Sequence, residues 1–554
     1  MFFNLITDSD KRMLPQIIRK NETILVFILI ALCLLLFFLR LGARPLWDVD
    51  EGKHAVTSME MVRSGDWITP TFNGEPFFDK PVLFNWLEAL AFLVFGFTEF
   101  AARLPAAILG TGCVLVTYLL GRKLANATVG FLAGVILATA VEFIILSRTV
   151  VHDISLVFLV TLALYLFYFA YQDIRHRQRN LLFFYAAMGL AVLAKGPLGL
   201  ALPAMVIGLF LIFERKLSFI KQMQIGWGIL IFLAVASPWY ILMCLKNPGY
   251  AEYFFISQNL GSFGSAHPRH PAPFYYYVPV LFGGFFPWSC FLPLAFIYAV
   301  RKRLQTVPGA AGFLVIWIGV IFIFFSIAGS KLPTYILPIF PAASLLTALL
   351  WYEMLKAPTP GIRRGFLVSF LPMVVIFMVA LIYVWTHPLV EVEHESGVTV
   401  SQMNLVAFWL VGTVVIAGVF LFRKKNRAFF GALVVMSVTT LHVFMLVIVP
   451  SVNPYRSTKE LAMQYDRLIP PGEKFTFCGR IKETALFYTG RRAQVLKKPD
   501  QLQNYLDSDK PEFCIITRNR YSDLKTPVYV LAQEGDKLLI SNKNLSVEQK
   551  ALNQ

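Results

Sequence analysis

The stretch LWDVDEGKHA, residues 46–55, places three carboxylates, Asp48, Asp50 and Glu51, directly after an apolar run. A carboxylate of this kind can take a proton from a reacting group or orient an amine or hydroxyl of a substrate. Carboxylates that begin a helix can equally cap free N–H groups and favour the positive end of the helix dipole. We predict a functional role for Asp50, whereas function and capping weigh equally for Asp48 and Glu51.

Other ionisable residues interrupt apolar sequence and add a second kind of chemistry. Four cations suit a phosphate or diphosphate group, and they are Lys80, Lys195, Arg269 and Lys331. Lys53, His54 and Tyr335 are further candidates for substrate binding, and Asp153 is a second candidate catalytic carboxylate beside Asp50. A single lysine at a helix end can simply extend its ammonium group to the membrane interface. The gathering of many such residues favours a group-transfer site instead.

One small group of residues suggests a metal. Asp79, His267 and His270 carry ligand atoms that a divalent ion accepts, but only two or three ligands are visible. The sequence therefore requires no cofactor, and a divalent metal remains the alternative at these three positions.

Long apolar segments must position these residues. The chain is 57% hydrophobic and only 15% charged, with a mean hydropathy of +0.63, which indicates a polytopic α-helical membrane protein. Thirteen spans are predicted, over residues 24–42, 104–121, 128–146, 154–171, 181–195, 197–213, 226–245, 276–299, 311–328, 333–351, 365–386, 404–422 and 428–449.

The apolar segment Val82–Phe97 decides the topology. It is shorter than the roughly 20 residues that a helix needs to cross a bilayer, and it carries Asn85 and Glu88. If it lies in the interface, the strongly basic loops all fall on one side, which the positive-inside rule makes cytoplasmic. We therefore predict an interfacial helix, with the first loop at 43–103 and the candidate site on the outer face.

The net charge of +17 comes from positive residues in the loops between apolar segments, which set the membrane topology and do not indicate nucleic-acid binding. No basic stripe with interleaved aromatic residues appears, so we predict membrane lipids as partners and no nucleic acid.

A separate domain is predicted after the membrane part at 1–450. Residues 451–554 have ordinary soluble composition, with strand-like runs at 474–478, 512–517 and 528–533 and a helix-like run from Asp500. This pattern predicts a small α/β domain on the outer side. Cys478 and Cys514 lie in it and could pair in an oxidising compartment.

Several motifs, in order along the chain, resemble those of a known family. They are DVDEGKHA, then MVRSGDWITPTFNGEPFFDKPVLFNWLEALAFLVFG, EFAARLPA, AKGP, PFYYYVPVLFGGFFPW and SKLPTYILPIFPA, which together cover most of residues 40–345. The chain resembles the bacterial membrane glycosyltransferases of the GT-C fold that use polyprenyl-phosphate sugars. This group holds the protein O-mannosyltransferases and the lipid A aminoarabinose transferases, and the latter also have thirteen spans and a periplasmic C-terminal domain.

The resemblance implies a reaction and a location. A sugar, 4-amino-4-deoxy-L-arabinose or a related one, would pass from undecaprenyl phosphate to lipid A with inversion at the anomeric carbon. The reaction would take place at the periplasmic face of the bacterial inner membrane. Asp50 matches the essential acidic residue of the family and Asp153 a second carboxylate. Residues matching the family's phosphate-binding or other functional positions are Lys80, Arg269, Tyr335 and Lys195.

Two departures from the family pattern concern the substrate. Lys53 and His54 stand where the aminoarabinose transferases usually show Arg-Tyr, and Asp79 replaces a glutamate. Lysine keeps a cation but cannot offer the bidentate fork of arginine. A protein hydroxyl or another glycan therefore remains an alternative acceptor.

Two other classes remain as alternatives. A lipid or sugar transporter also carries intramembrane charges, but its site should lie near the midplane, often between inverted repeats, and none is found in the sequence. A non-catalytic scaffold would leave the polar residues without a role.

Overall fold

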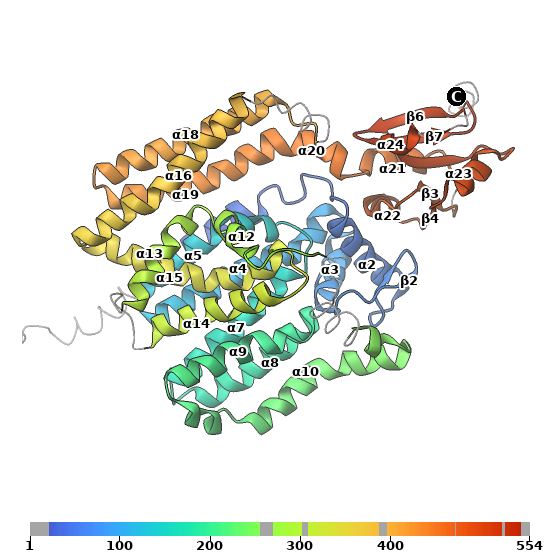
Figure 1. Ribbon diagram of the computed structural model, residues 1–554. Coiled ribbons are helices and arrows are strands. Elements are labelled where there is room, and N and C mark those ends of the chain that lie inside the picture. Colours follow the sequence, from blue (N-terminus) through green and yellow to red (C-terminus); the bar gives the residue numbers. More distant parts are fainter. Residues whose placement is uncertain are drawn as a thin grey trace, which may run out of the picture.

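The computed structural model describes residues 22–254, 270–301, 309–386, 396–470, 472–522, 524 and 527–544. Long helices form most of the molecule, and a small domain with a β-sheet lies at one end (Figure 1). Helices α16 (Pro360–Thr386), α18 (Val400–Phe422) and α19 (Asn426–Val443) form one outer layer. Helices α8 (Arg177–Lys195), α9 (Leu198–Phe213) and α10 (Ile225–Lys246) lie on the opposite side of the molecule.

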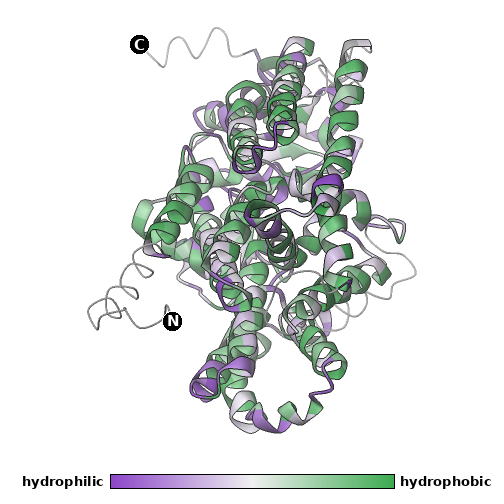
Figure 2. Ribbon diagram, turned by 90° about the vertical axis from the view of Figure 1, so that its left-hand side faces the viewer, coloured by the Kyte–Doolittle hydropathy of each residue, from purple (hydrophilic) through white to green (hydrophobic). Residues whose placement is uncertain are grey.

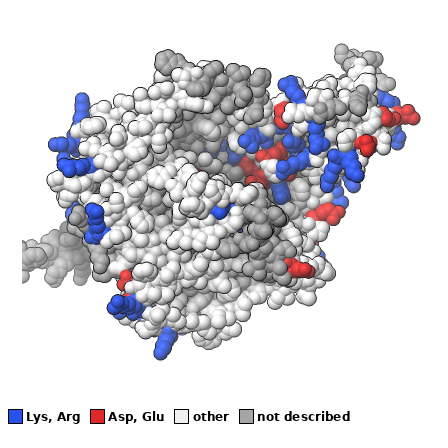
Figure 3. Space-filling model, viewed as in Figure 1, with Lys and Arg blue, Asp and Glu red and all other residues white. Residues whose placement is uncertain are grey.

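The helix lengths support a membrane protein but not a count of thirteen spans. Within the described ranges, eight helices are long and apolar enough to cross a membrane, or up to nine if one bent pair counts as a span. Three predicted spans correspond to shorter apolar helices, at Glu22–Phe38, Ala127–Ala138 and Leu198–Phe213. A fourth corresponds to Arg177–Lys195, which has 19 residues but is less apolar. Apolar residues make up most of the helical part (Figure 2), and the face of it seen in Figure 3 carries few charges. The number thirteen therefore stays a prediction.

Two predicted spans are not continuous helices. The segment predicted at 128–146 divides into α5 (Ala127–Ala138) and α6 (Val141–Leu146). The segment predicted at 276–299 divides into α12 (Tyr277–Gly284) and a second piece, Trp288–Val300, bent by 115°. Pro287 stands at this bend, where its missing N–H and fixed φ are unfavourable inside a helix.

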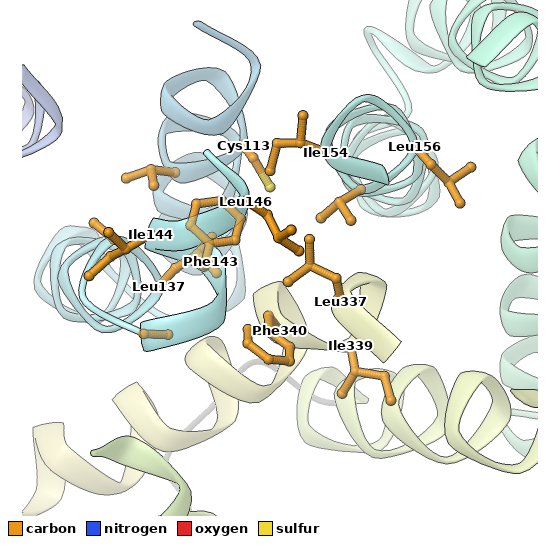
Figure 4. Close-up of a cluster of buried hydrophobic side chains, with 14 of the residues drawn as sticks. Cys113, Leu137, Phe143, Ile144, Leu146, Ile154, Leu156, Leu337, Ile339 and Phe340 are labelled. Carbon is orange, nitrogen blue, oxygen red and sulfur yellow. The ribbon is translucent and has the colours of Figure 1, made fainter. Parts of the chain in front are cut away.

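The central packing joins the remaining long helices. In Figure 4, side chains of α4 (Glu99–Leu124), α5, α6 and α7 (Asp153–Gln172) meet those of the 3₁₀ segment η5 (Pro333–Ile339) and α15 (Phe340–Lys356). The buried residues drawn there include Cys113, Phe143, Ile154 and Leu337, and they are apolar. A close-packed centre of this kind holds the ends of α7 and η5 in fixed relative positions. A further long apolar helix is α14 (Ala310–Ile327).

The predicted first loop contains two helices. Helix α2 (Asp50–Ser64) is followed by α3 (Leu83–Phe95), whose 13 residues span about 20 Å, less than a bilayer core. Before α3, Asn73 exchanges hydrogen bonds with Ala493 of the C-terminal domain, and after it Glu99 forms an ion pair with Lys459 of the same domain at 2.7 Å. The segments that flank α3 therefore both contact one domain, which supports the interpretation of Val82–Phe97 as an interfacial helix.

The C-terminal domain has the predicted α/β character. Its five-stranded sheet has the order β4-β3-β5-β7-β6, with β3 pairing in parallel with β4 and β5, and β7 running antiparallel to β5 and β6. The strands are β3 (Phe475–Cys478), β4 (Ala493–Leu496), β5 (Phe513–Thr517), β6 (Tyr529–Glu534) and β7 (Lys537–Ser541). The helices are α21 (Lys459–Asp466), α22 (Glu483–Thr489), α23 (Pro499–Leu506) and α24 (Arg518–Tyr521), and α20 (Val449–Arg456) leads into the domain. Cys478 and Cys514 are both free thiols.

Candidate active site

A polar cavity of about 450 Å³ brings together residues from distant parts of the chain. Helix α2 contributes Asp50 and His54, the segment before α3 contributes Asp79 and Lys80, and the end of α8 contributes Lys195. The start of α7 contributes His152 and Asp153, and Tyr335 comes from η5. The predicted convergence of these cations and carboxylates is thus observed in one cavity.

Lys195 and Asp153 form an ion pair across the cavity wall. Both side chains are largely buried, and the Lys195 ammonium also lies over the ring of Tyr335, 4.6 Å from the ring centroid. The carboxylate and the aromatic face hold the ammonium group in place. An incoming phosphate would therefore meet an ordered cation, with Asp153 as its counter-ion.

Lys80 is held beside the same cavity by its neighbour in the sequence. Its Nζ lies 3.3 Å from Oδ2 of Asp79. Burial would raise the pKa of Asp79, but the charges of Lys80 and Lys53 outweigh it and keep that pKa below its ordinary value. Asp79 is therefore ionised at neutral pH and forms an ion pair with Lys80.

Asp50 and His54 lie on one side of α2, one turn apart. The Asp50 side chain is exposed, and it makes no hydrogen bond or ion pair with the described residues. Burial lowers the pKa of His54 to about 4, so its ring is neutral at pH 7. Asp50 thus has a free carboxylate at the cavity, while His54 supplies an uncharged ring.

Neither Asp48 nor Glu51 caps α2, although Glu51 lies in its first turn, near the positive end of the helix dipole. The N-cap residue of α2 is Val49, and no side chain caps it. The Glu51 carboxylate is buried and binds Arg103, with Nε of Arg103 at 2.8 Å, and Arg44 at 2.7 Å. Asp48 instead accepts hydrogen bonds from Thr458 and Thr484 of the C-terminal domain. Both carboxylates are used in tertiary contacts that fix the start of α2.

Two of the remaining predicted residues do not line the cavity, and the third is not described by the structure. Lys53 does not line the cavity, and its Nζ lies over the ring of Phe77 at 4.4 Å from the centroid. Lys331 does not line it either, because its buried Nζ donates to the carbonyl of Ala328 at 2.5 Å. Arg269 lies outside the described residues.

The metal hypothesis gains no support from the geometry. Asp79 and His270 both line the cavity, but His267 lies outside the described residues. Across the part of the chain that the structure describes, no group of three or more His, Cys, Asp or Glu residues could hold a metal ion. We therefore derive no step of the reaction through a metal.

His152 was not predicted as a site residue. It lines the cavity between His54 and Phe84, with ring centroids 4.4 Å and 4.9 Å away. A sequence signal was present, since His152 directly precedes Asp153 at the end of an apolar segment.

An apolar groove adjoins the polar cavity at the α8–α9 turn. It has a volume of about 750 Å³ and is lined by Val192, Pro197, Leu200, Phe232, Tyr240 and other side chains of α8, α9 and α10. Lys195 and Leu198, on the same turn, line the polar cavity. A ligand with a charged head and a long hydrocarbon tail would fit across the two.

Comparison with solved structures defines the fold. The crystal structure of ArnT from Cupriavidus metallidurans bound to undecaprenyl phosphate matches with a TM-score of 0.79 and 22% sequence identity. The match covers 94% of this chain and 98% of that one. The protein thus has the GT-C fold of a membrane glycosyltransferase, with the small sheet domain at its C-terminus.

Sequence comparison gives the family. The protein-family model described as dolichyl-phosphate-mannose-protein mannosyltransferase matches residues 79–242 of this chain. The undecaprenyl phosphate-alpha-4-amino-4-deoxy-L-arabinose arabinosyl transferase of Aeromonas hydrophila is 30% identical over 393 residues, 69% of this chain and 70% of that protein. The protein of the same name from Aeromonas salmonicida is 33% identical over 342 residues, 61% of either chain. The chain belongs to this family of glycosyltransferases.

Proposed function

We propose that this chain transfers 4-amino-4-deoxy-L-arabinose, or a related sugar, from undecaprenyl phosphate to a phosphate group of lipid A. The observation that carries the proposal is the cavity that combines Lys80 and Lys195 with the unpaired Asp50, beside an apolar groove. The names of the relatives support the sugar and its lipid carrier.

The two lysines would act on the leaving group. In an inverting displacement, an acceptor oxygen bonds to the anomeric carbon while the bond from that carbon to the phosphate oxygen breaks. The bonding electrons leave with undecaprenyl phosphate, which gains negative charge. Lys80 and Lys195 line the same cavity, where ammonium groups would stabilise that charge. The groove along α8–α10 would take the beginning of the polyprenyl chain.

Asp50 would act on the sugar rather than on the acceptor. A lipid A phosphate is already an anion, so it needs no general base. The carboxylate of Asp50 has no partner among the described residues and suits a hydrogen bond or ion pair with an amino or hydroxyl group of the sugar.

A protein hydroxyl is the second candidate acceptor. The family model that matches residues 79–242 bears the name of protein mannosyltransferases, and the match includes Lys80, Asp153 and Lys195. A hydroxyl must lose a proton as it attacks, and Asp50 would then be the general base.

We further propose that the chain lies in the bacterial inner membrane with thirteen spans. The cavity and the C-terminal domain would face the periplasm. The contacts of Asn73 and Glu99, on either side of α3, with the C-terminal domain support this topology, because they would keep the first loop and that domain on one side.

Asp50→Asn tests the proposal. The purified variant in lipid nanodiscs, supplied with undecaprenyl phosphate-linked aminoarabinose and lipid A, should transfer sugar at least about 100-fold more slowly than wild type. Asp500→Asn, at an exposed position of α23, is the matched control and should retain activity. Wild-type transfer rates in a folded Asp50→Asn variant would remove Asp50 from the mechanism.

A further inference from the structure

A buried chain of polar side chains runs from the cavity wall into the first loop. His152 lines the cavity, and behind it lie Asn85, Ser58 and Glu88. All four are at most 3% exposed. Buried polar groups are costly unless they are paired, so a connected series of this length calls for an explanation.

The orientation of the Asn85 amide group sets the direction of the chain. The Ser58 hydroxyl donates to Oε2 of Glu88 at 2.6 Å and accepts from Nδ2 of Asn85 at 3.0 Å. Asn85 therefore turns its oxygen, Oδ1, toward Nε2 of His152, 3.3 Å away. A carbonyl oxygen can only accept, so with Asn85 in this orientation the contact assigns the hydrogen to Nε2.

The other ring nitrogen of His152 is consequently an acceptor. Burial, together with the charges of Lys80 and Lys195, lowers the pKa of His152 well below its ordinary value, so the ring is neutral. With the hydrogen on Nε2, the Nδ1 atom presents a lone pair. Nδ1 is buried and has no hydrogen-bond partner among the described residues. A buried acceptor without a donor is a free-energy cost, and a donor from a ligand in the cavity removes it only when the His152 ring turns Nδ1 toward that cavity.

The chemistry of the cavity limits which ligand group can pair with this atom. A phosphate carries acceptor oxygens and negative charge, which suit the ammonium groups of Lys80 and Lys195 and not a lone pair. A sugar hydroxyl or a sugar ammonium group carries the hydrogen that Nδ1 lacks. We propose that Nδ1 of His152 accepts a hydrogen bond from the transferred sugar, and that Asn85 and Ser58 are positioning residues that fix its tautomer.

This inference rests on the proposed function and adds a division of labour within the cavity. The two lysines would recognise the phosphate, which every polyprenyl phosphate has. His152 would recognise the sugar, which only the loaded donor has. The neighbouring ring of His54 is the other group that could approach Nδ1, and a role confined to holding His54 would affect both lipids alike.

The test compares two lipids. The affinity of the purified full-length protein is measured for undecaprenyl phosphate alone and for undecaprenyl phosphate-linked 4-amino-4-deoxy-L-arabinose. His152→Phe should bind the sugar-loaded lipid about tenfold more weakly and the unloaded lipid within about twofold of wild type. Ser58→Ala should show a smaller loss of the same kind. His152→Gln, which restores a carbonyl acceptor, should recover part of the affinity.

Thr57→Val is the matched control, because Thr57 is a buried hydroxyl of α2 that bonds to the Lys53 carbonyl and not to the chain of polar residues. Thermal unfolding identifies any variant that fails to fold. Equal losses for both lipids, or no loss for either, in a folded His152→Phe variant would overturn the assignment of His152 alone. Failure of the wild-type protein to transfer the sugar would instead overturn the proposed function.

Discussion

The carboxylate of Asp48 accepts a hydrogen bond from the backbone amide of Thr484 at 2.8 Å, although the two positions lie 436 residues apart. The hydroxyls of Thr484 and Thr458 donate to the same carboxylate, each at 3.1 Å. At Gly52, a Cβ atom would come within 2.7 Å of the Thr484 amide nitrogen, so the C-terminal domain packs directly on the first turn of α2. Asp50 lies between these two contacts, and the domain therefore helps to set its position.

Asp48→Ala should loosen that contact. Three hydrogen bonds to a carboxylate are lost, which we expect to lower the free energy of unfolding by about 1–3 kcal/mol and to reduce sugar transfer without changing the cavity residues. Thermal unfolding and transfer assays of the purified variant measure both effects. Asp500→Ala, an exposed carboxylate of the same domain, is the control. Unchanged stability and activity would mean that the domain does not position α2.

Glu51→Gln should destabilise the fold in a pH-dependent manner. Burial would raise the pKa of Glu51, but Arg103 and Arg44 outweigh it and lower that pKa to about 2. A depressed folded-state pKa stabilises the fold above the ordinary value of 4.5, and this contribution is lost as the pH falls toward 2. At pH 7 the variant leaves Arg103 without its counter-ion, which should cost about 3–5 kcal/mol.

Unfolding of wild type and Glu51→Gln across pH 7 to 3 measures this difference. The two proteins should converge in stability as the pH falls. Glu75→Gln, at an exposed strand position, controls for the loss of one charge. A constant difference across this range would contradict the assigned role of the Glu51–Arg103 pair.

Lys80→Met should impair donor use. Methionine keeps the length of the side chain but not its charge, so the departing phosphate loses one stabilising cation. We expect kcat/KM for transfer to fall about 100-fold. Lys246→Met is the control, because Lys246, on α10, is half exposed and pairs with Asp66. Steady-state transfer rates over a range of donor concentrations provide the measurement. A reduction no larger than that of the control would exclude Lys80 from the site.

Cysteine labelling tests the placement of α3. Single cysteines replace Ser64, before α3, and Phe97, after it, in a variant without the six native cysteines. Both positions are exposed, and both should react with a membrane-impermeant reagent from the periplasmic side. Reaction of the two positions from opposite sides would show that Val82–Phe97 crosses the membrane.

The sequence predicted the parts of this structure that depend on local pattern. Apolar runs predicted most helix positions, and strand-like runs predicted strands β3, β5 and β6. The convergence of Asp50, Lys80, Asp153 and Lys195 followed from topology, because all of them stand near the same ends of apolar segments. These residues are now observed around one cavity.

The features that were missed depend on tertiary contacts. Arg103 lies 52 positions from Glu51 and Thr484 lies 436 positions from Asp48, and no local pattern encodes such pairs. The same is true of Asn85 and His152, whose hydrogen bond joins α3 to the start of α7. The bend of 115° between α12 and the following piece was missed because hydropathy records composition and not direction.

Mass spectrometry of lipid A tests the central claim most directly. Lipid A is isolated from cells that express the wild-type chain, the Asp50→Asn variant or neither, with the undecaprenyl phosphate-linked donor supplied in each case. We predict an added aminoarabinose mass on lipid A phosphate only in cells with the wild-type chain. Unmodified lipid A in cells where the folded wild-type protein and its donor are both verified would contradict the account.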